Sequence, residues 1–185
     1  PLLLISGGLR ATLFTAFGPK TEFRYSDGVT RSEGSINDTV RYRGGEVLKM
    51  YPGLEYRLSS RIIVTPDISI KLGMQRVYQY IHMISNTTSM SPTDIWKLSD
   101  RYIRPQRSDQ LSLGVYGNLG RKAIETSAEA YYKKLKNILD YKGGATLLMN
   151  EHLETDVISG NGKAYGVELM VKKQYGTFTG WISYT

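Results

Sequence analysis

The sequence predicts an all-β protein: an antiparallel up-and-down meander that is part of a large transmembrane outer-membrane β-barrel. Three observations predict this fold class. Seven stretches alternate in polarity with a period of two residues, which is the signature of a β-strand. The connections between them alternate strictly between short and long, and one face of the stretches carries most of their charge. The 19 glycines and 14 tyrosines also favour strands and turns over helices.

The composition narrows the possible classes of protein. With 185 residues, the chain is long enough for one domain with a sizeable core. No run approaches the roughly 18 apolar residues of a transmembrane helix. The absence of cysteine excludes disulfides and thiolate metal sites. The net charge of +7 is spread along the chain without a long basic run, which is typical of a solvated surface, so we expect no nucleic-acid partner.

The alternation locates the seven strands. In the second, Leu58, Ile62 and Val64 fall on one face, while Arg57 and Arg61 fall on the other. The full set is expected at residues 5–17, 55–64, 68–80, 110–116 and 124–133, and as the two arms of a hairpin within 164–185 that turns at 174–177.

Residues 127–141 also fit an amphipathic helix, because apolar residues such as Ala128 and Leu135 recur there at helical spacing. The local abundance of Ala, Glu, Lys and Leu favours a helix as well. We nevertheless predict a strand, since the alternation runs from Lys122 to Tyr132. A helix would also break the regular order of short and long connections.

That order carries information about the fold. The short connections are expected at 65–67, 118–121 and 174–177, and the long ones at 18–54, 85–109 and about 141–163. In a meander, this order places every short turn at one end of the sheet and every long loop at the other. Soluble sandwiches have no physical reason for this segregation, whereas outer-membrane barrels have short periplasmic turns and long extracellular loops.

The charged face requires a wet environment, because a dry core could not hold so many unpaired charges. The lumen of a wide barrel could hold them. We therefore expect a lumen-facing charge ladder in which Lys133 and Lys172 pair with the glutamates of neighbouring strands. Its members are Arg57, Arg61, Glu125, Glu129, Glu168 and Lys172.

The opposite face is expected to contact lipid. Its rows end at the long-loop side with Tyr78, Tyr80 and Tyr132, where an aromatic girdle is expected. Arg76 is the exception in an otherwise uncharged row. An arginine costs about 2–4 kcal/mol at the bilayer midplane and about 0–1 near an interface. We therefore expect Arg76 at the interface.

Several blocks of the sequence resemble, in this order, the barrel of TonB-dependent outer-membrane receptors. They are Gly8-Leu9-Arg10, Tyr51-Pro52-Gly53-Leu54-Glu55-Tyr56-Arg57-Leu58, Tyr80-Ile81-His82, Pro92-Thr93-Asp94-Ile95-Trp96, Arg104-Pro105-Gln106, Gln110-Leu111-Ser112-Leu113-Gly114, Tyr131-Tyr132-Lys133, the run 160–168 and Gly180-Trp181-Ile182-Ser183-Tyr184-Thr185. The chain departs from the family pattern at Tyr56, since the pattern often continues Pro-Arg after Leu-Glu.

The resemblance implies location in the bacterial outer membrane, binding of a nutrient ligand at the cell surface and import driven by the inner-membrane TonB energy-coupling complex. It implies no enzymatic activity and no cofactor. Residues 1–185 then form a partial barrel domain of about seven strands, and we expect the plug domain and the closing strands to lie outside this chain. The identity of the imported ligand is not indicated by the sequence.

The long connection at 85–109 is where such a receptor would contact its ligand. It carries residue types that are enriched at binding hot spots, namely Trp96, Arg101, Tyr102 and Arg104. The same residues could equally pack the loop onto its neighbours.

The same residues support other classes of protein less well. On physical grounds, a porin-like barrel without a plug is the nearest alternative, followed by a soluble β-sheet module that binds glycan or nucleic acid. Glu125 and Glu129 would lie roughly 13 Å apart along one strand, too far to share a reacting bond. His82 and His152 lack metal-ligand spacing, so we expect neither a catalytic nor a metal site.

Overall fold

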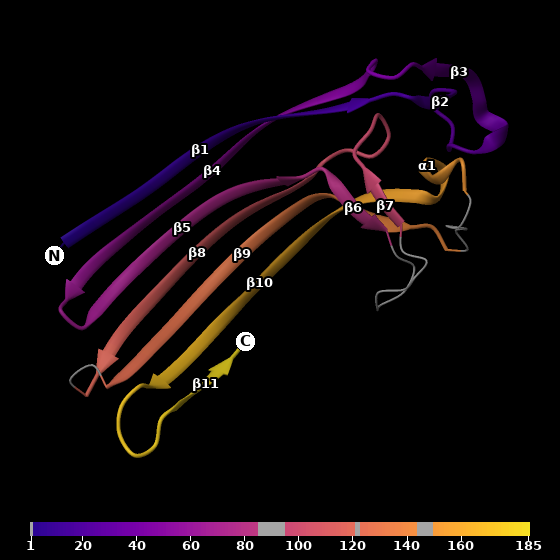
Figure 1. Cartoon of the computed structure of the whole chain (residues 1–185). Helices are drawn as coiled ribbons and strands as arrows, with labels where there is room; N and C mark the ends of the chain where they lie inside the picture. The colour runs from indigo at the N-terminus through magenta and orange to yellow at the C-terminus, as the bar shows by residue number, and fades with distance from the viewer. Residues whose placement is uncertain (1, 85–94, 121–122, 144–149) are drawn as a thin grey trace.

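The computed structural model describes residues 2–84, 95–120, 123–143 and 150–185. Its main feature is one seven-stranded antiparallel sheet with the strand order β1-β4-β5-β8-β9-β10-β11 (Figure 1). The strands are β1 (Leu2–Phe17), β4 (Val47–Thr65), β5 (Ile68–Gln79), β8 (Gln106–Leu119), β9 (Ile124–Tyr141), β10 (Val157–Lys173) and β11 (Gly180–Tyr184). The all-β, antiparallel prediction is confirmed. The sheet is open, with β1 and β11 at its edges.

Most strands of the sheet are longer than predicted, because each extends into a stretch expected to be loop. β4 begins at Val47 and passes through Pro52 and Gly53, which the sequence analysis treated as loop residues. The β4–β5 ladder ends at Tyr56 and Arg76, so the first half of β4 pairs only with β1. A proline is tolerated in such an edge position, where no second ladder needs its missing N–H.

The short and long connections lie at opposite ends of the sheet (Figure 1). The long ones are not plain loops. They contain the hairpin β2 (Lys20–Tyr25) and β3 (Ile36–Tyr42) with the 3₁₀ turn η1 (Glu33–Ser35), the hairpin β6 (Ile81–Ile84) and β7 (Ile95–Leu98), and the short helix α1 (Leu153–Asp156). We call these elements, together with segment 99–105, the cap. Parts of the expected connections, at 85–94, 121–122 and 144–149, lie outside the described residues.

The alternative of a helix over residues 127–141 is excluded by strand β9, which pairs with β8 on one side and β10 on the other. A bulge interrupts the β9–β10 register at Gly160 and Asn161. Opposite it, Asn137 has a positive φ of 56°, and its side-chain amide donates to the Pro105 carbonyl over 2.8 Å. No helix in the described part of the chain is long and apolar enough to cross a membrane.

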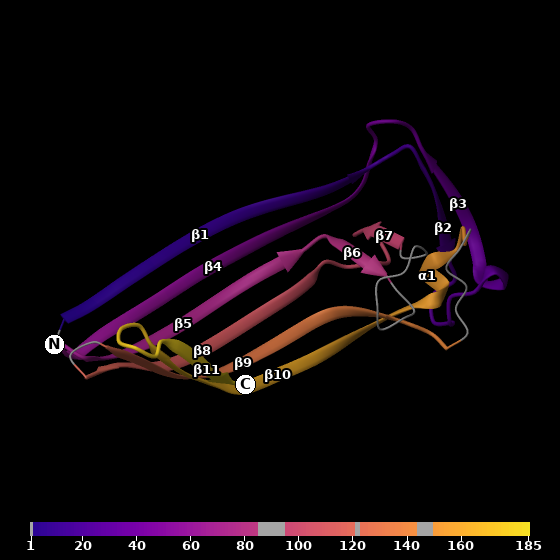
Figure 2. The same ribbon diagram turned by 60° about the horizontal axis from the view of Figure 1, so that its bottom comes forward.

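The sheet has two chemically different faces. The register places successive rows of uncharged residues across one side, which we call the apolar face. Three of these rows are Ile70–Val115–Ala128–Leu169, Leu72–Leu113–Ala130–Val167 and Met74–Leu111–Tyr132–Tyr165. The other side, the polar face, carries the alternate residues. Figure 2 shows that the sheet is curved and that the cap lies at one end of it.

Most buried apolar residues of the described chain belong to the cap, and the exception, Leu48, lies at the cap end of β4. Ile84 and Leu153 form a small core onto which Leu139, Tyr141 and Val157 pack. Large residues of the apolar face are, by contrast, exposed: Leu113 is 52% exposed and Tyr165 is 77% exposed. No described element covers this face.

Tyrosine rings lie over glycines on the polar face and fix the local packing. A Cβ at Gly114 would lie 2.9 Å from Cε2 of Tyr116, which is closer than real Cβ contacts. We predict that Gly114→Val lowers the free energy of unfolding by about 1–3 kcal/mol, because the ring must leave its position. Gly8→Val is the matched control, since nothing lies within 4 Å of a Cβ there. Equal losses in denaturant titrations of the two variants would contradict this packing argument.

Candidate functional site

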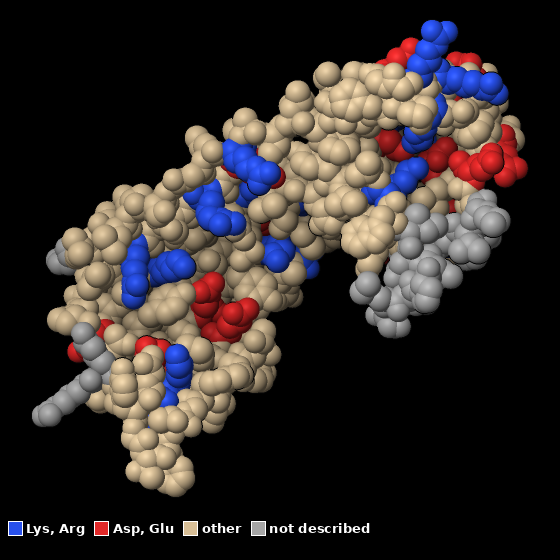
Figure 3. All heavy atoms as spheres, viewed as in Figure 1, with Lys and Arg blue, Asp and Glu red and all other residues tan. Residues whose placement is uncertain are grey.

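The polar face carries all six residues that the sequence assigns to a charge ladder. Arg57 and Arg61 come from β4, Glu125 and Glu129 from β9, and Glu168 and Lys172 from β10. They share a face because each alternates with residues of the apolar rows. Figure 3 shows basic side chains over β4 and β5, and a group of acidic side chains nearer β9 and β10.

Only part of the expected charge pairing is present. Lys172 lies 3.8 Å from Glu125, as the ladder requires. Lys133 instead faces Gln110 and Ala164 in the register, so it does not oppose a glutamate of a neighbouring strand. The residue opposite Glu129 is Glu168. The expected Lys133 pairing was wrong, because a strand register cannot be derived from alternation within single strands.

Neutral side chains hydrogen-bond to charges of the polar face that have no ion partner among the described residues. The Tyr116 hydroxyl donates to Oε2 of Glu129 over 2.5 Å. The Arg61 guanidinium donates through Nε to the Ser69 hydroxyl over 3.0 Å. Farther along the polar face toward the cap, the amide of Gln75 donates to that of Gln110 over 3.2 Å. The polar face is therefore a hydrogen-bonded surface that suits water or a polar partner.

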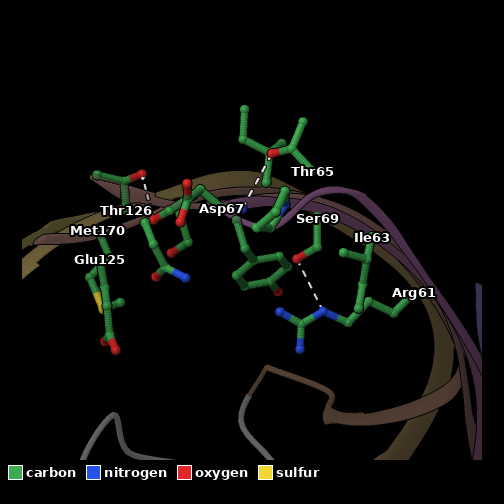
Figure 4. A pocket seen from close by; sticks show the side chains of 14 residues that line it. Arg61, Ile63, Thr65, Asp67, Ser69, Glu125, Thr126 and Met170 are labelled. Carbon is green, nitrogen blue, oxygen red and sulfur yellow. Dashed lines mark hydrogen bonds between the residues drawn. The ribbon is translucent and has the colours of Figure 1, made fainter. Parts of the chain in front are cut away.

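A pocket of about 340 Å³ opens on the polar face beside the short turns. Figure 4 shows Arg61 and Glu125 on the same side of the sheet and at opposite ends of this pocket, with Ser69 between them. The pocket thus places a guanidinium and a carboxylate at the two ends of an open, polar-lined concavity. This arrangement suits a polar chain segment or water better than an apolar ligand.

Aromatic residues near the cap do not all lie where the girdle prediction places them. Tyr80 stacks on Phe14, with ring centroids 4.9 Å apart, and its hydroxyl lies 2.7 Å from that of Thr12. Both partners belong to the polar-face side of β1, so the outward position expected for Tyr80 was wrong. The β4–β5 ladder has already ended before this point, where the Glu55 carboxylate accepts from the Tyr78 N–H over 3.0 Å. The simple alternation therefore no longer applies.

Asp100 is the centre of the cap. Its side chain is 6% exposed, and the carboxylate binds Lys20 at 2.6 Å and Lys97 at 3.6 Å. The other carboxylate oxygen accepts from the backbone N–H groups of Tyr102 and Ile103, each over 3.0 Å. Burial alone would raise the pKa of Asp100, but Lys20, Lys97 and the Ile103 N–H outweigh it and hold that pKa below its ordinary value.

Two of the four proposed ligand-contact residues hold the cap together. Arg101 donates to the buried carboxylate of Glu22 over 2.7 Å. The Tyr102 hydroxyl donates to the Phe23 carbonyl over 2.7 Å. For Arg101 and Tyr102, the packing alternative therefore describes the contacts that the structure shows.

Trp96 and Arg104, in contrast, are exposed, with Trp96 at 60%. They remain available for contact with another molecule. Residues 92–94, which precede Trp96 in the block that carries the resemblance, lie outside the described residues.

A second cluster in the cap joins elements that are distant in the sequence. The Tyr25 hydroxyl donates to Glu154 Oε1 over 2.8 Å, and Arg31 donates to the Glu154 carbonyl over 3.3 Å. Phe23 packs against the ring of His152, with centroids 4.4 Å apart. Burial and the bond to Glu154 raise the pKa of Tyr25, so its phenol remains protonated as a donor.

His82 is buried in the cap with its Nε2 3.0 Å from the hydroxyl of Ser99, which is fully buried. Burial lowers the pKa of His82 below its ordinary value and outweighs the opposing effect of Asp100. The imidazole is therefore neutral at about pH 7. Because neither side chain reaches solvent, we interpret the pair as a structural hydrogen bond.

Acidification is expected to loosen the cap around His82. A group with a lowered pKa in the folded state stabilises fully above its unfolded pKa of about 6.5, and this contribution is lost as the pH falls below that value. Amide exchange at Ile84 and Ser99, corrected for intrinsic rates, should therefore accelerate between about pH 7 and pH 5. His82→Gln keeps a hydrogen-bonding side chain that does not titrate, so it should abolish the acceleration. A full pH response in this variant would contradict the assignment to His82.

Sequence reasoning missed most of the cap contacts. Lys20, Glu22 and Asp100 are ordinary charged residues in predicted loops, and no periodicity marks them. Asp109 was not predicted either; it lies on the apolar side of the sheet and binds Arg76 at 2.5 Å. Extending the alternation of the fourth expected strand by one residue, from Gln110 to Asp109, would have placed this carboxylate on the same face as Arg76.

Within the described residues, no group of three His, Cys, Asp or Glu side chains could hold a metal ion. Comparisons with known proteins assign no family: no protein-family model, curated protein or solved structure matches this chain.

Proposed function

We propose that this chain is part of the wall of a TonB-dependent outer-membrane receptor, which binds a nutrient ligand at the cell surface and imports it with energy from the inner membrane. The observation that carries the proposal is the open apolar face of the seven-stranded sheet. Monomeric soluble proteins rarely leave so large and continuous an apolar surface in water.

The dimensions of the sheet support a bilayer as the environment of this face. A transmembrane β-strand needs about 9–11 residues, and β4, β9 and β10 have 19, 18 and 17. The three uncharged rows across β5, β8, β9 and β10 would face lipid. The remaining length would carry the strands beyond the membrane toward the cap.

The two ends and the polar face support a receptor barrel. Short turns at one end and a folded cap at the other follow the periplasmic and extracellular pattern of outer-membrane barrels. The charges of the polar face would line the lumen and face the plug domain of such a receptor. Trp96 and Arg104, which the cap leaves exposed, are our candidates for contact with the imported ligand.

Single-cysteine labelling of the full-length protein in intact cells tests this topology, and the described chain is well suited to it because it contains no cysteine. Arg104→Cys should react with a membrane-impermeant maleimide added outside the cell, whereas Asp67→Cys at a short turn should react only after the outer membrane is opened. Leu113→Cys should react only with a lipid-soluble reagent. Equal reaction of all three with the impermeant reagent would overturn the membrane assignment.

Energy coupling is tested separately by cross-linking. The full-length protein should form a cross-link with TonB in cells that contain the inner-membrane complex. Correct labelling topology without any such cross-link would favour the porin-like barrel instead.

A further inference from the structure

We infer that the cap-side margin of the apolar face is a binding site for the phosphate headgroups of anionic lipids. The inference rests on the proposed function, because it needs the apolar face to contact a bilayer. The site is a charged row in which five cations accompany one carboxylate. We define the charged row as Arg76, Arg107, Asp109, Lys134, Lys136 and Lys163.

The strand register brings these residues together. Arg76, Asp109, Lys134 and Lys163 are successive partners across β5, β8, β9 and β10, in the row that follows Met74–Leu111–Tyr132–Tyr165 toward the cap. Arg107 and Lys136 are partners one row further on. Neighbouring strands lie about 4.8 Å apart, so the row spans the width of a few lipid headgroups.

The charged row contains more cationic side chains than its single carboxylate, Asp109, can pair with. Asp109 binds both Arg76, at 2.5 Å, and Arg107, at 2.9 Å. Lys134, Lys136 and Lys163 have no ion pair with any described residue, and Nε of Arg107 has no hydrogen-bond partner within the described part of the chain. Lys134 and Lys163 also oppose each other directly. Like charges in that position repel unless an external anion lies between them.

The residues beside the charged row favour an amphiphilic molecule, a lipid, as the source of that anion. Directly beside the row, on its membrane side, lie Tyr132 and Tyr165, which are register partners and are both exposed. The guanidinium of Arg76 lies over the ring of Tyr56, 5.2 Å from its centroid. Tyrosine and basic side chains favour the interface where acyl chains meet headgroups. A lipid phosphate can therefore reach the lysines while its acyl chains lie along the apolar rows.

A plain solvated surface is the competing explanation of these lysines. The polar face differs from the charged row in its anions, because Lys172 pairs with Glu125 there, and Glu129 and Glu168 lie on the same face. The charged row instead gathers unpaired lysines at one edge of an uncharged surface. Basic residues near an anionic membrane surface attract it by about 1 kcal/mol each, equivalent to roughly fivefold in affinity.

The experiment uses the full-length protein in detergent micelles, titrated with phosphatidylglycerol or phosphatidylcholine, with bound lipid counted by native mass spectrometry. We expect phosphatidylglycerol to be retained in preference to phosphatidylcholine. The triple variant Lys134→Gln, Lys136→Gln, Lys163→Gln should weaken this binding by roughly 100-fold. The matched control, Lys71→Gln, Lys133→Gln, Lys172→Gln, removes the same charge from the polar face and should bind as the wild type does.

Any of the following outcomes would overturn the inference of a lipid-binding site. Equal binding by the two triple variants would show that the charged row does not hold the lipid. Inorganic phosphate that competes as well as the lipid, at equal phosphate concentration, would show a site for a free anion. Correct cysteine-labelling topology together with no lipid preference would overturn this inference alone. A protein that fails the labelling test would overturn the proposed function and this inference together.

Discussion

Replacing Leu113 by arginine is expected to lower the stability of the membrane-inserted protein by about 2–4 kcal/mol, the cost of an arginine near the bilayer midplane. Leu113 lies in the middle of the uncharged rows and is 52% exposed in the isolated chain. In water, the same substitution at so exposed a position would change stability by no more than about 0.5 kcal/mol. The measurement is the free energy of unfolding from phospholipid vesicles, obtained by denaturant titration of the full-length protein.

The adjacent residue provides the control. Ser112 precedes Leu113 on β8, points to the polar face and borders a cavity of about 180 Å³. Ser112→Arg therefore adds the same charge where water and space are available, and we expect a change of less than about 1 kcal/mol. If both variants lose equally little stability, the apolar face does not contact lipid.

Removing the charge of Asp100 is expected to destabilise the cap by about 2–3 kcal/mol, the upper range for hydrogen bonds to charged groups. Asp100→Asn keeps an oxygen for the N–H groups of Tyr102 and Ile103, but it leaves Lys20 and Lys97 without their common carboxylate. The cost stays below that of a fully buried pair because the Lys20 side chain is 33% exposed. Amide exchange in β2 and in segment 99–103 would measure the effect.

Asp38→Asn is the matched control for this variant, since the Arg24–Asp38 pair spans 3.8 Å and both side chains are largely exposed. The stability lost in Asp38→Asn should lie below about 1 kcal/mol.

The pH dependence of cap stability gives a further check on Asp100. Because the pKa of Asp100 is lowered on folding, its stabilisation is complete above the unfolded value of about 3.9 and is lost as the pH falls further. Wild-type protein should lose cap protection in this acid range, and Asp100→Asn should not.

The sheet could be predicted from the sequence because its information is local. Alternation over ten or so residues identifies a strand and its two faces, as it does for β9 despite the helical propensity of that segment. The positions of the short turns follow from the same pattern. The pairing of Glu129 with Glu168 could not be predicted in this way, because a register depends on the relative shift of two strands.

The cap was not predictable for a different physical reason. Its stability comes from single polar contacts, such as Lys20 with Asp100 and Arg101 with Glu22, between segments that are far apart in the sequence. No periodic pattern accompanies such contacts. Arg101 and Tyr102 were recognised as unusual loop residues, but their type alone does not distinguish a ligand contact from a contact within the fold.

The bond between Tyr25 and Glu154 has a consequence for the time course of folding. It joins residues 129 positions apart, and the Lys20–Asp100 pair joins residues 80 apart. Closing such long loops is entropically unfavourable until the intervening strands are aligned. The cap should therefore assemble last, after β4 to β10 have paired. Protection of the Tyr25 region in a refolding experiment would then mark molecules in which β4 to β10 are already in register.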